Sequence, residues 1–551
     1  MLQTVMIPTK GGLNLSATNQ ELLSLPNEAL ILDNMEASRG GGYRRIDGYE
    51  EYGTTTLPGG VEPVRGIHTY LGGILVIKGT SIYHSFGGFV WTKVNKISNG
   101  VTKAVLDAQP NNAELDNGVT RKVVNIKTFV EGTKTHVYMV TGNSAPIYLL
   151  INGTTEVSAL YTYREVALGT ELVGAKSIAI FQDQVILANT TEHPTSIIYS
   201  SLSTTDLTVA ELAAGLTVRE KYDGSTSGQI SVSKTITGLA VHRNSLYVFT
   251  DTTISKVDGL NSGNPQVIPV TEDIGCIDGA TIQEVGGDLV YLAADGLRTL
   301  SQTVRIGDVE LGVISRKIAP ITDALLIDRA SITFSSCVIR KKNQYRLWYT
   351  SSNTPSDEQR GIIATYAYDS RTGGSNWEYS LMLGWEVNSI HSGEDSNGVE
   401  FSVFGNSTGK VYSFEKTFAT FDGTAIPWKY QSPFVDFGDS GVRKNIHKAL
   451  VNMIAEGLVS GELAIKYDYQ SNHSPQPDPW NLVNQTPPAI MGVGLLGNPL
   501  LILGAGGFTN EAIYTEGSGF QASFIISDVG LSDDPFEIQS IQVNFAPSGR
   551  I

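Results

Sequence analysis

Short alternations of apolar and polar residues recur along most of this chain, from residue 64 to about residue 414. In each unit a short apolar strand leads to a turn rich in Gly, Asn or Asp, and an aromatic-rich strand follows, as in residues 236–249. Period-two alternation that ends in such turns is typical of β-strands joined as hairpins. The pattern therefore predicts an all-β fold.

Seven such units lie within this region, at a spacing of roughly 50 residues, which is within the range of propeller blades. A unit of three or four strands cannot bury both of its faces alone, whereas radial packing around a channel covers them. We therefore predict a β-propeller of about seven blades over residues 61–425. Two successive β-sandwiches with similar hairpins would give a comparable pattern and remain the alternative.

The regions on either side of the propeller differ from it and from each other. Residues 1–60 are glycine-rich and aperiodic, with little apolar content, and we expect an extended N-terminal arm that packs on the propeller or on a neighbouring subunit. Residues 426–551 alternate again and predict a β-sandwich, interrupted by a protruding insertion at about 471–519. Proteolysis near residues 417–424 should then release two resistant cores.

The insertion contains the most apolar window of the chain, residues 489–508. Its length approaches that of a membrane span, but its glycines and Asn498-Pro499 interrupt it, so we expect no membrane span. Copies of the chain that meet around an axis would bury this surface against one another and narrow a channel, or the segment completes its own sandwich core. The candidates for the channel constriction are Leu495, Leu496, Leu500 and Leu501.

Composition and charge narrow the function classes. Glycine is abundant, at 58 of 551 residues, and charged residues are few, at 17%, a balance that favours strands and turns over helices. The net charge of −16 excludes a generally basic nucleic-acid binder. Residues 467–551 carry eight acidic residues against Arg550 alone. The basic cluster Arg39, Arg44 and Arg45 fits either a phosphate or an ion pair between subunits.

The sequence motifs that could form a disulfide framework, a metal site or a phosphate-binding loop are all incomplete. The two cysteines, Cys276 and Cys337, cannot form a disulfide framework or a four-thiolate site and are predicted to fill the core. The eight histidines show no metal-binding spacing. Residues 405–410 imitate a phosphate loop between two strands, where a hairpin turn is the simpler interpretation. Residues 395–398 resemble the start of a calcium loop but lack its later acidic ligand.

No catalytic constellation stands out either. Residues 370–377 form one degenerate copy of the S-x-D-x-G-x-x-W turn of propeller sialidases, with Thr372 in the place of the aspartate. A pair of carboxylates for glycoside hydrolysis stays open, because its members would come from different blades. We expect no enzyme, and no catalytic, cofactor-binding or metal site.

Several segments share their order with a known family. At the N-terminus these are Gly11-Gly12-Leu13-Asn14, Leu25-Pro26-Asn27-Glu28-Ala29, Leu32-Asp33-Asn34-Met35 and Gly40-Gly41-Gly42-Tyr43-Arg44-Arg45-Ile46-Asp47-Gly48-Tyr49. Residues 197–202, 274–298 and 430–438 follow in the same order. Together they resemble the tail nozzle proteins of short-tailed bacteriophages, the packaged-DNA stabilisation (tail tubular protein B-like) family.

The resemblance implies a structural virion protein built on a propeller and arranged as a homohexamer, which conducts DNA and retains it until ejection. Its partners would be adaptor or head-to-tail connector proteins above, and tail fibre, needle or plug proteins. Double-stranded DNA would pass without sequence recognition. The protein would reside in the phage tail, after assembly in the host cytoplasm. The subunit or adaptor contact candidates are Gly11, Gly12, Asn14, Pro26, Arg44 and Arg45.

Two other hypotheses remain beside the nozzle: a carbohydrate-binding or glycan-cleaving receptor-binding tail component, and a cellular propeller scaffold. A nozzle fits the acidic balance, since basic groups along a conduit would hold the passing phosphates. Because the arm is expected to hold the ring together, deleting residues 1–45 should abolish ring assembly or attachment to the adaptor and leave the β-structure intact.

Overall fold

The computed structural model describes most of the chain. The described residues are 2–38, 41–70, 73–87, 90–96, 125–132, 134–142, 146–152, 160–165, 170–213, 216–262, 264–301, 313–351, 358–369, 374–395, 397–416, 418–483, 488–489, 502–503, 507–531 and 534–550. The predicted constriction residues Leu495, Leu496, Leu500 and Leu501 lie outside this set, as does Arg39.

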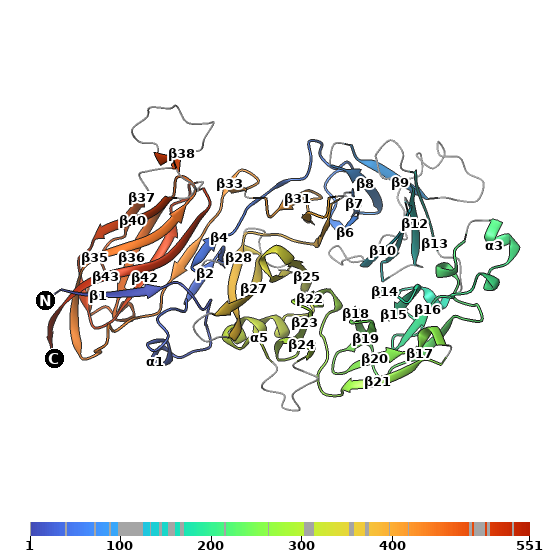
Figure 1. Cartoon of the computed structure of the whole chain (residues 1–551), viewed down its shortest axis with the longest axis horizontal. Helices are drawn as coiled ribbons and strands as arrows, with labels where there is room; N and C mark the ends of the chain where they lie inside the picture. The colour runs from blue at the N-terminus through green and yellow to red at the C-terminus, as the bar shows by residue number, and fades with distance from the viewer. Residues whose placement is uncertain are drawn as a thin grey trace.

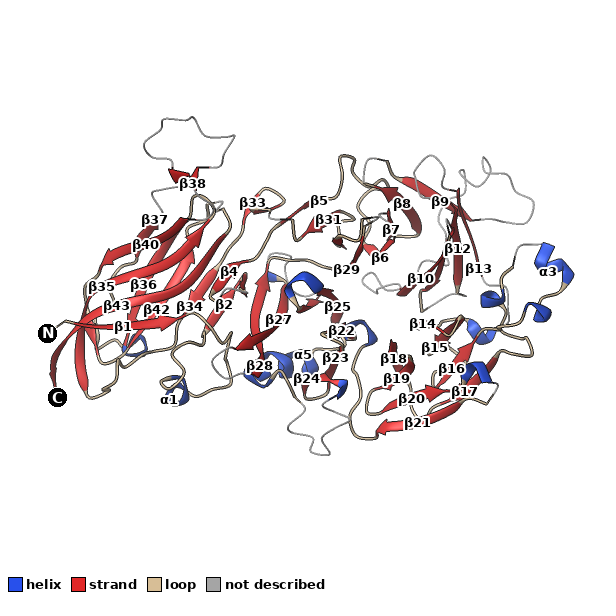
Figure 2. Cartoon of the chain, in the orientation of Figure 1, coloured by secondary structure: helices blue, strands red, loops and turns tan. Residues whose placement is uncertain are grey.

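The structure confirms the predicted all-β fold, with a propeller, an N-terminal arm and a C-terminal sandwich (Figure 1). Figure 2 shows how few helices accompany the strands; the labelled ones are α1 (Asn19–Leu22), α3 (Val209–Ala213) and α5 (Ala319–Ile327). Within the described residues, no helix has the length and apolar character needed to cross a membrane.

Seven groups of strands surround the propeller axis. The first three are β6 (Val64–Tyr70), β7 (Gly73–Lys78), β8 (Ser81–Phe86) and β9 (Thr92–Lys96); β10 (Asn125–Glu131), β11 (Lys134–Val140), β12 (Ile147–Asn152) and β13 (Leu160–Glu165); and β14 (Ser177–Phe181), β15 (Gln184–Ala188), β16 (Ser196–Tyr199) and β17 (Gly228–Ser231). The next two are β18 (Ile236–His242), β19 (Ser245–Thr250), β20 (Ile254–Asp258) and β21 (Gln266–Thr271); and β22 (Gln283–Val285), β23 (Asp288–Ala293) and β24 (Gly296–Thr299). The last two are β25 (Ile332–Ile339), β26 (Gln344–Ser351), β27 (Arg360–Asp369) and β28 (Gly374–Leu383); and β29 (Ser389–Glu394), β30 (Glu400–Gly405) and β31 (Val411–Phe414) with β5 (Tyr49–Glu51).

Hydrogen bonding joins these groups into six sheets. The first two groups share one eight-stranded sheet, because β9 and β13 pair in parallel over two residues on each strand. The predicted count of about seven blades thus matches the strand groups and is only approximate for the sheets. The innermost strands contact one another in a closed circle, from β6 through β10, β14, β18, the turn Gly279–Thr281, β25 and β29 back to β6. The alternative of two successive sandwiches is wrong.

The hairpins follow from the turn residues. In two of them the turn residues, Gln182-Asp183 and Arg243-Asn244, have positive φ, between 46° and 64°. Two consecutive residues in the left-handed region form the turn whose twist matches that of paired strands. The segment at 405–410 also lies between paired strands, β30 and β31, as the hairpin interpretation predicts.

The sandwich consists of two sheets. One contains β1 (Gln3–Pro8), β3 (Met35–Ala37), β4 (Tyr43–Arg45), β35 (Val442–Ala455), β40 (Gly507–Tyr514), β41 (Ser518–Gly519) and β43 (Phe536–Arg550). The other contains β34 (Lys429–Gln431), β36 (Ser460–Tyr467), β37 (Trp480–Val483) and β42 (Ala522–Asp528), and it continues through β2 (Ile31–Asp33) into β28 of the propeller. Two short pairings complete the strands: β32 (Thr420–Phe421) with β33 (Thr424–Ala425), and β38 (Pro488–Ala489) with β39 (Ile502–Leu503).

The arm packs against both domains and contributes apolar side chains to the core that they share. The sequence did not indicate this contribution. Ile7, Leu13, Leu32, Met35 and Tyr43 are all buried in the same hydrophobic cluster as the sandwich strands and β26–β28. The hairpin β32–β33 occupies the expected cleavage region and joins β5 of the arm. A cut there would leave the two domains joined through β2, so the two predicted resistant cores are expected to stay associated after cleavage.

Candidate functional site

Two places in the fold gather the features that bear on function: the junction where the arm joins the propeller to the sandwich, and the axis of the propeller. At the junction, β2 pairs antiparallel with β34 of the sandwich and parallel with β28 of the propeller. Asn34, which follows β2 with a φ of 53°, uses its side-chain amide to donate to the carbonyls of Leu383 (3.2 Å) and Pro427 (2.6 Å). One arm residue thus bonds to both domains.

Gly12 packs closely against β28 of the propeller. Its N–H donates to the Tyr43 hydroxyl at 2.8 Å, and the next residue, Leu13, donates to the Tyr379 carbonyl at 2.7 Å. The φ of Gly12 is +75°, and a Cβ at this position would lie 2.6 Å from the Tyr379 nitrogen. Only glycine fits here, because both the backbone angle and the space exclude a side chain.

We expect Gly12→Ala to lower the free energy of unfolding by about 2–4 kcal/mol, from the strained φ together with the clash against backbone. The matched control is Gly287→Ala, which has a φ of +80° but no atom within 4 Å of the new Cβ. Chemical denaturation of both variants checks the prediction. Equal losses in the two variants would mean that the Gly12 contact adds nothing to the backbone strain.

The other predicted arm residues also contact their own chain. The Asn14 amide donates to Glu28 Oε2 at 2.5 Å, and Lys317 Nζ lies 2.7 Å from Glu28 Oε1 and donates to the Gly11 carbonyl at 2.8 Å. Pro26 is half-buried between α1 and β2. These contacts show what the residues do within a single subunit. Their role between subunits or toward an adaptor stays a prediction.

The two described arginines of the basic cluster are engaged as well. Arg44 Nη2 lies 3.0 Å from Asp47 Oδ1, and Arg45 is buried, with Nη1 donating to the Ala419 carbonyl at 3.0 Å. Arg45 is thus enclosed by its own chain, whereas the side chain of Arg44 stays 23% exposed and its phosphate interpretation stays a prediction. The arginines help to hold the arm against the propeller and the segment that follows it.

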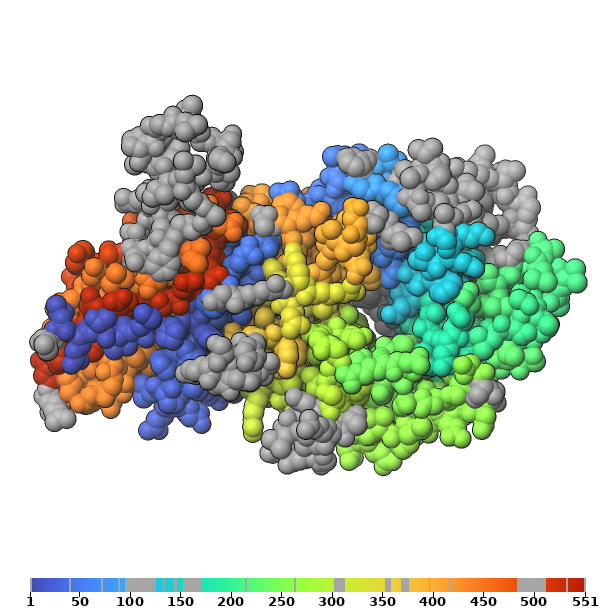
Figure 3. Space-filling view, viewed as in Figure 1, coloured from blue at the N-terminus to red at the C-terminus, as the bar shows by residue number. Residues whose placement is uncertain are grey.

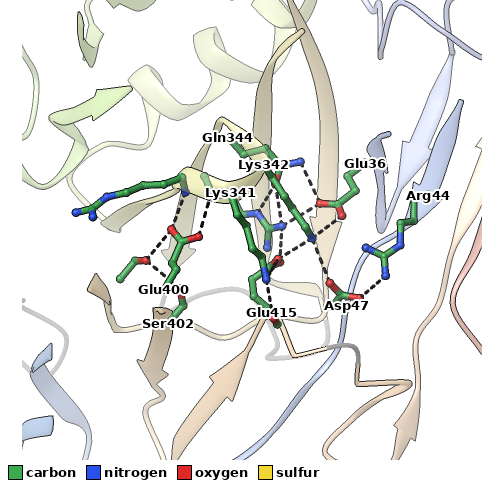
Figure 4. A network of polar contacts seen from close by, with 12 residues as sticks. Glu36, Arg44, Asp47, Lys341, Lys342, Gln344, Glu400, Ser402 and Glu415 are labelled. Atoms are coloured by element: carbon green, nitrogen blue, oxygen red, sulfur yellow. Dashed lines mark hydrogen bonds and ion pairs between the residues drawn. The ribbon is translucent and has the colours of Figure 1, made fainter. Parts of the chain in front are cut away.

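A buried ionic network lies beside these arginines and links β3 of the arm to the sixth and seventh strand groups (Figure 4). Arg346 Nη2 lies 3.0 Å from Glu36 Oε2 and 2.6 Å from Glu415 Oε1. Lys342 Nζ lies 2.6 Å from Glu36, 2.6 Å from Glu415 and 3.2 Å from Asp47. Three carboxylates and two cations therefore share one site, with Arg44 as a further partner of Asp47.

Burial and ion pairing oppose each other in this network. Burial alone would raise the pKa of Glu415, but Arg346 and Lys342 outweigh it and lower that pKa to about 2. Burial alone would lower the pKa of Lys342, but Glu36 and Glu415 raise it above its usual value. Both residues consequently stay charged at neutral pH, and the network depends on all of its members being present.

The second place is a cavity of about 560 Å³ on the propeller axis. Every strand group contributes residues to its wall, and the ionisable ones are His68, Lys127, Lys176, Asp278, Glu284, Arg340 and His391. Serine, threonine and asparagine supply much of the rest. The space-filling view shows the propeller hollowed between the cyan and green segments (Figure 3). A cavity of this size is within the range of small-ligand sites.

Two histidines of the wall, His68 and His391, lie against each other and bond to neighbouring threonines. The rings of His68 and His391 lie with centroids 4.0 Å apart. His68 Nε2 hydrogen-bonds to Thr128 Oγ1 at 3.1 Å, and His391 Nδ1 accepts from the Thr69 N–H at 3.2 Å. Burial lowers the pKa of both rings, with help from the nearby charge of Lys127, and brings that of His391 to about 3. Both rings are therefore neutral at pH 7.

The described residues contain no group of three or more His, Cys, Asp or Glu side chains arranged to hold a metal ion. Asp395, in the segment that resembles a calcium loop, accepts hydrogen bonds from the Asn397 and Val399 N–H groups at 2.8 and 2.9 Å. Its carboxylate closes a turn. Cys276 and Cys337 are free and buried, as predicted, and burial raises the pKa of both thiols.

Fold and site together define a β-propeller protein whose C-terminal sandwich is fastened to the propeller by an N-terminal arm. No protein family matches the chain, and no curated protein matches it. Among solved structures, the chain is similar to two structures of the Hsv2 protein from Kluyveromyces lactis, and the TM-score is 0.28 for both. One is 8% identical over 57% of this chain and 83% of the other, and the second is 9% identical over 58% and 97%. Similarity at this level carries no functional inference.

Proposed function

We propose that this protein is a structural subunit of the tail of a short-tailed phage, a nozzle that forms a homohexameric ring and retains packaged DNA until ejection. One observation carries the proposal beyond the sequence resemblance. Four of the segments that resemble the nozzle family, residues 11–14, 32–35, 40–49 and 430–438, are far apart in the sequence but contribute described residues to one junction, where β2 pairs with β34 and Gly12 contacts Tyr43 and Tyr379.

A ring subunit of this kind has to transmit load between the parts that contact its neighbours. A continuous sheet from β28 through β2 to β34 and the buried ionic network would supply that stiffness in each subunit. We infer no catalytic role. The net charge of −16 favours a conduit that does not grip the phosphates of passing duplex DNA. The partners would be an adaptor above and fibre, needle or plug proteins below.

The test is the mass and shape of the purified full-length chain. Mass photometry should give a species of about six times 59.3 kDa, and negative-stain images should show rings with six-fold symmetry. Addition of the adaptor protein should favour this species if the ring needs a template. Monomers that stay monomeric at micromolar concentration with and without the adaptor would contradict the proposal.

A glycan-binding tail component is the second candidate, and the polar cavity on the propeller axis is the observation that favours it. This candidate predicts monomers or trimers that bind host polysaccharide. A glycan array probed with the purified chain separates the two candidates, because a nozzle has no reason to retain a sugar specifically.

A further inference from the structure

Lys127 differs from the other charged residues of the propeller cavity. In the part of the chain that the structure describes, it forms no hydrogen bond or ion pair. Its side chain reaches solvent through the cavity, yet the surrounding protein desolvates the ammonium and lowers its pKa. Lys127 therefore presents an ammonium without a counter-charge to the interior of the cavity.

The neighbours of Lys127 do not supply that counter-charge. The charge of Lys127 acts on the neutral rings of His68 and His391, on β6 and β29, which carry no negative charge. Because His391 Nδ1 accepts a hydrogen bond from Thr69, the proton of the neutral ring resides on Nε2, which has no partner among the described residues. Lys127 on β10 and His391 on β29 thus leave two unused donors on the two inner strands that flank β6 in the cavity wall.

The remaining charges of the wall are already engaged or lie across the ring. Arg340 pairs with Glu394. Asp278 accepts the Ala280 N–H at 2.8 Å, and Glu284 lies 3.4 Å from His242 Nδ1, both in the strand group opposite β6 and β10. No carboxylate in the described wall therefore reaches Lys127, although acidic residues outnumber basic ones in the chain by 55 to 39.

We propose that the propeller cavity binds a small oxyanion-bearing ligand, whose carboxylate or phosphate group pairs with Lys127 on the side formed by β6, β10 and β29. The hydroxyl-rich remainder of the wall, with Thr141, Ser336 and Ser389 among its residues, suits a ligand that carries hydroxyl groups beside the anion. The site is independent of the nozzle proposal, since a ring subunit can assemble with or without it.

The test is thermal unfolding of the full-length protein with millimolar phosphate or glucuronate, against sodium chloride at equal ionic strength and against uncharged glucose. Phosphate or glucuronate should raise Tm in a saturable way, and chloride and glucose should not. Whichever oxyanion is more effective identifies the anionic group of the ligand. A wild-type protein that neither oxyanion stabilises beyond the chloride control would overturn the proposal.

Substitutions at Lys127 decide whether the binding is at this site. Lys127→Met and Lys127→Gln should weaken binding at least tenfold, whereas Lys127→Arg, which keeps the charge, should retain it within about threefold. Lys466→Met, on β36 of the sandwich, is the matched control and should bind as the wild type does. Undiminished binding by Lys127→Gln would also overturn the assignment.

Discussion

Deleting residues 1–45 is expected to unfold the sandwich and to open the propeller, and not only to prevent assembly. The deletion removes β1 to β4 and with them Ile7, Leu13, Leu32, Met35 and Tyr43, all buried in the largest core cluster. Burial of each large apolar side chain contributes about 1.5–3 kcal/mol. The loss from five of them reaches the whole stability of a typical domain, about 5–15 kcal/mol.

Near-ultraviolet circular dichroism and cooperative thermal unfolding of the truncated chain measure this effect. We expect a loss of the native aromatic signal and of the cooperative transition. The matched control is deletion of residues 1–8, which removes only the edge strand β1 and should leave a cooperative transition at lower temperature. A truncated chain that unfolds in the same cooperative transition as the wild type, and fails only to assemble into rings, would contradict this prediction. That result would support the role in assembly alone that the sequence suggested.

The second large effect is expected at Arg346. Replacing Arg346 by Met leaves Lys342 as the cation that Glu36 and Glu415 still share, and removing one partner of such a buried pair costs about 3–5 kcal/mol. Arg340 provides the matched control in the same strand group: its side chain is 64% exposed, against 0% for Arg346, and it pairs with an exposed carboxylate. Arg340→Met should cost less than about 1 kcal/mol.

The pH dependence of the Arg346→Met effect is a check on its cause. The pKa of Glu415 in the folded protein is about 2, below its usual 4.5, so its pairing stabilises the fold above pH 4.5 and that contribution is lost as the pH falls toward 2. The difference between wild type and variant should therefore shrink over the same range. Denaturant titrations at pH 7 and pH 3 measure it, and a difference that does not change with pH would assign the effect to lost packing.

Much of the propeller was predictable because its signal is local. Each hairpin alternates apolar and polar residues and closes on turn residues such as Arg243-Asn244, and both features can be read within ten residues. The closure of the ring was not predictable in this way. Its last sheet takes Tyr49–Glu51 as a strand, and three residues from an aperiodic arm carry no period of their own.

The ionic network was missed for a similar reason. Glu36, Arg346 and Glu415 come from three distant segments, and in the sequence each resembles an ordinary surface charge. The low overall content of charge gave no hint that some of it is buried. The arm residues Gly12 and Asn34 were found through the family resemblance, but their role in the junction follows only from the contacts with Tyr379, Leu383 and Pro427.

The most direct test of the nozzle proposal is a cryo-electron microscopy reconstruction of the tail of the phage that encodes this chain. The proposal predicts six copies in a ring immediately below the head-to-tail adaptor, with the arm of each subunit between its propeller and sandwich. A tail that lacks this chain, or that carries it only in peripheral fibres, would contradict it.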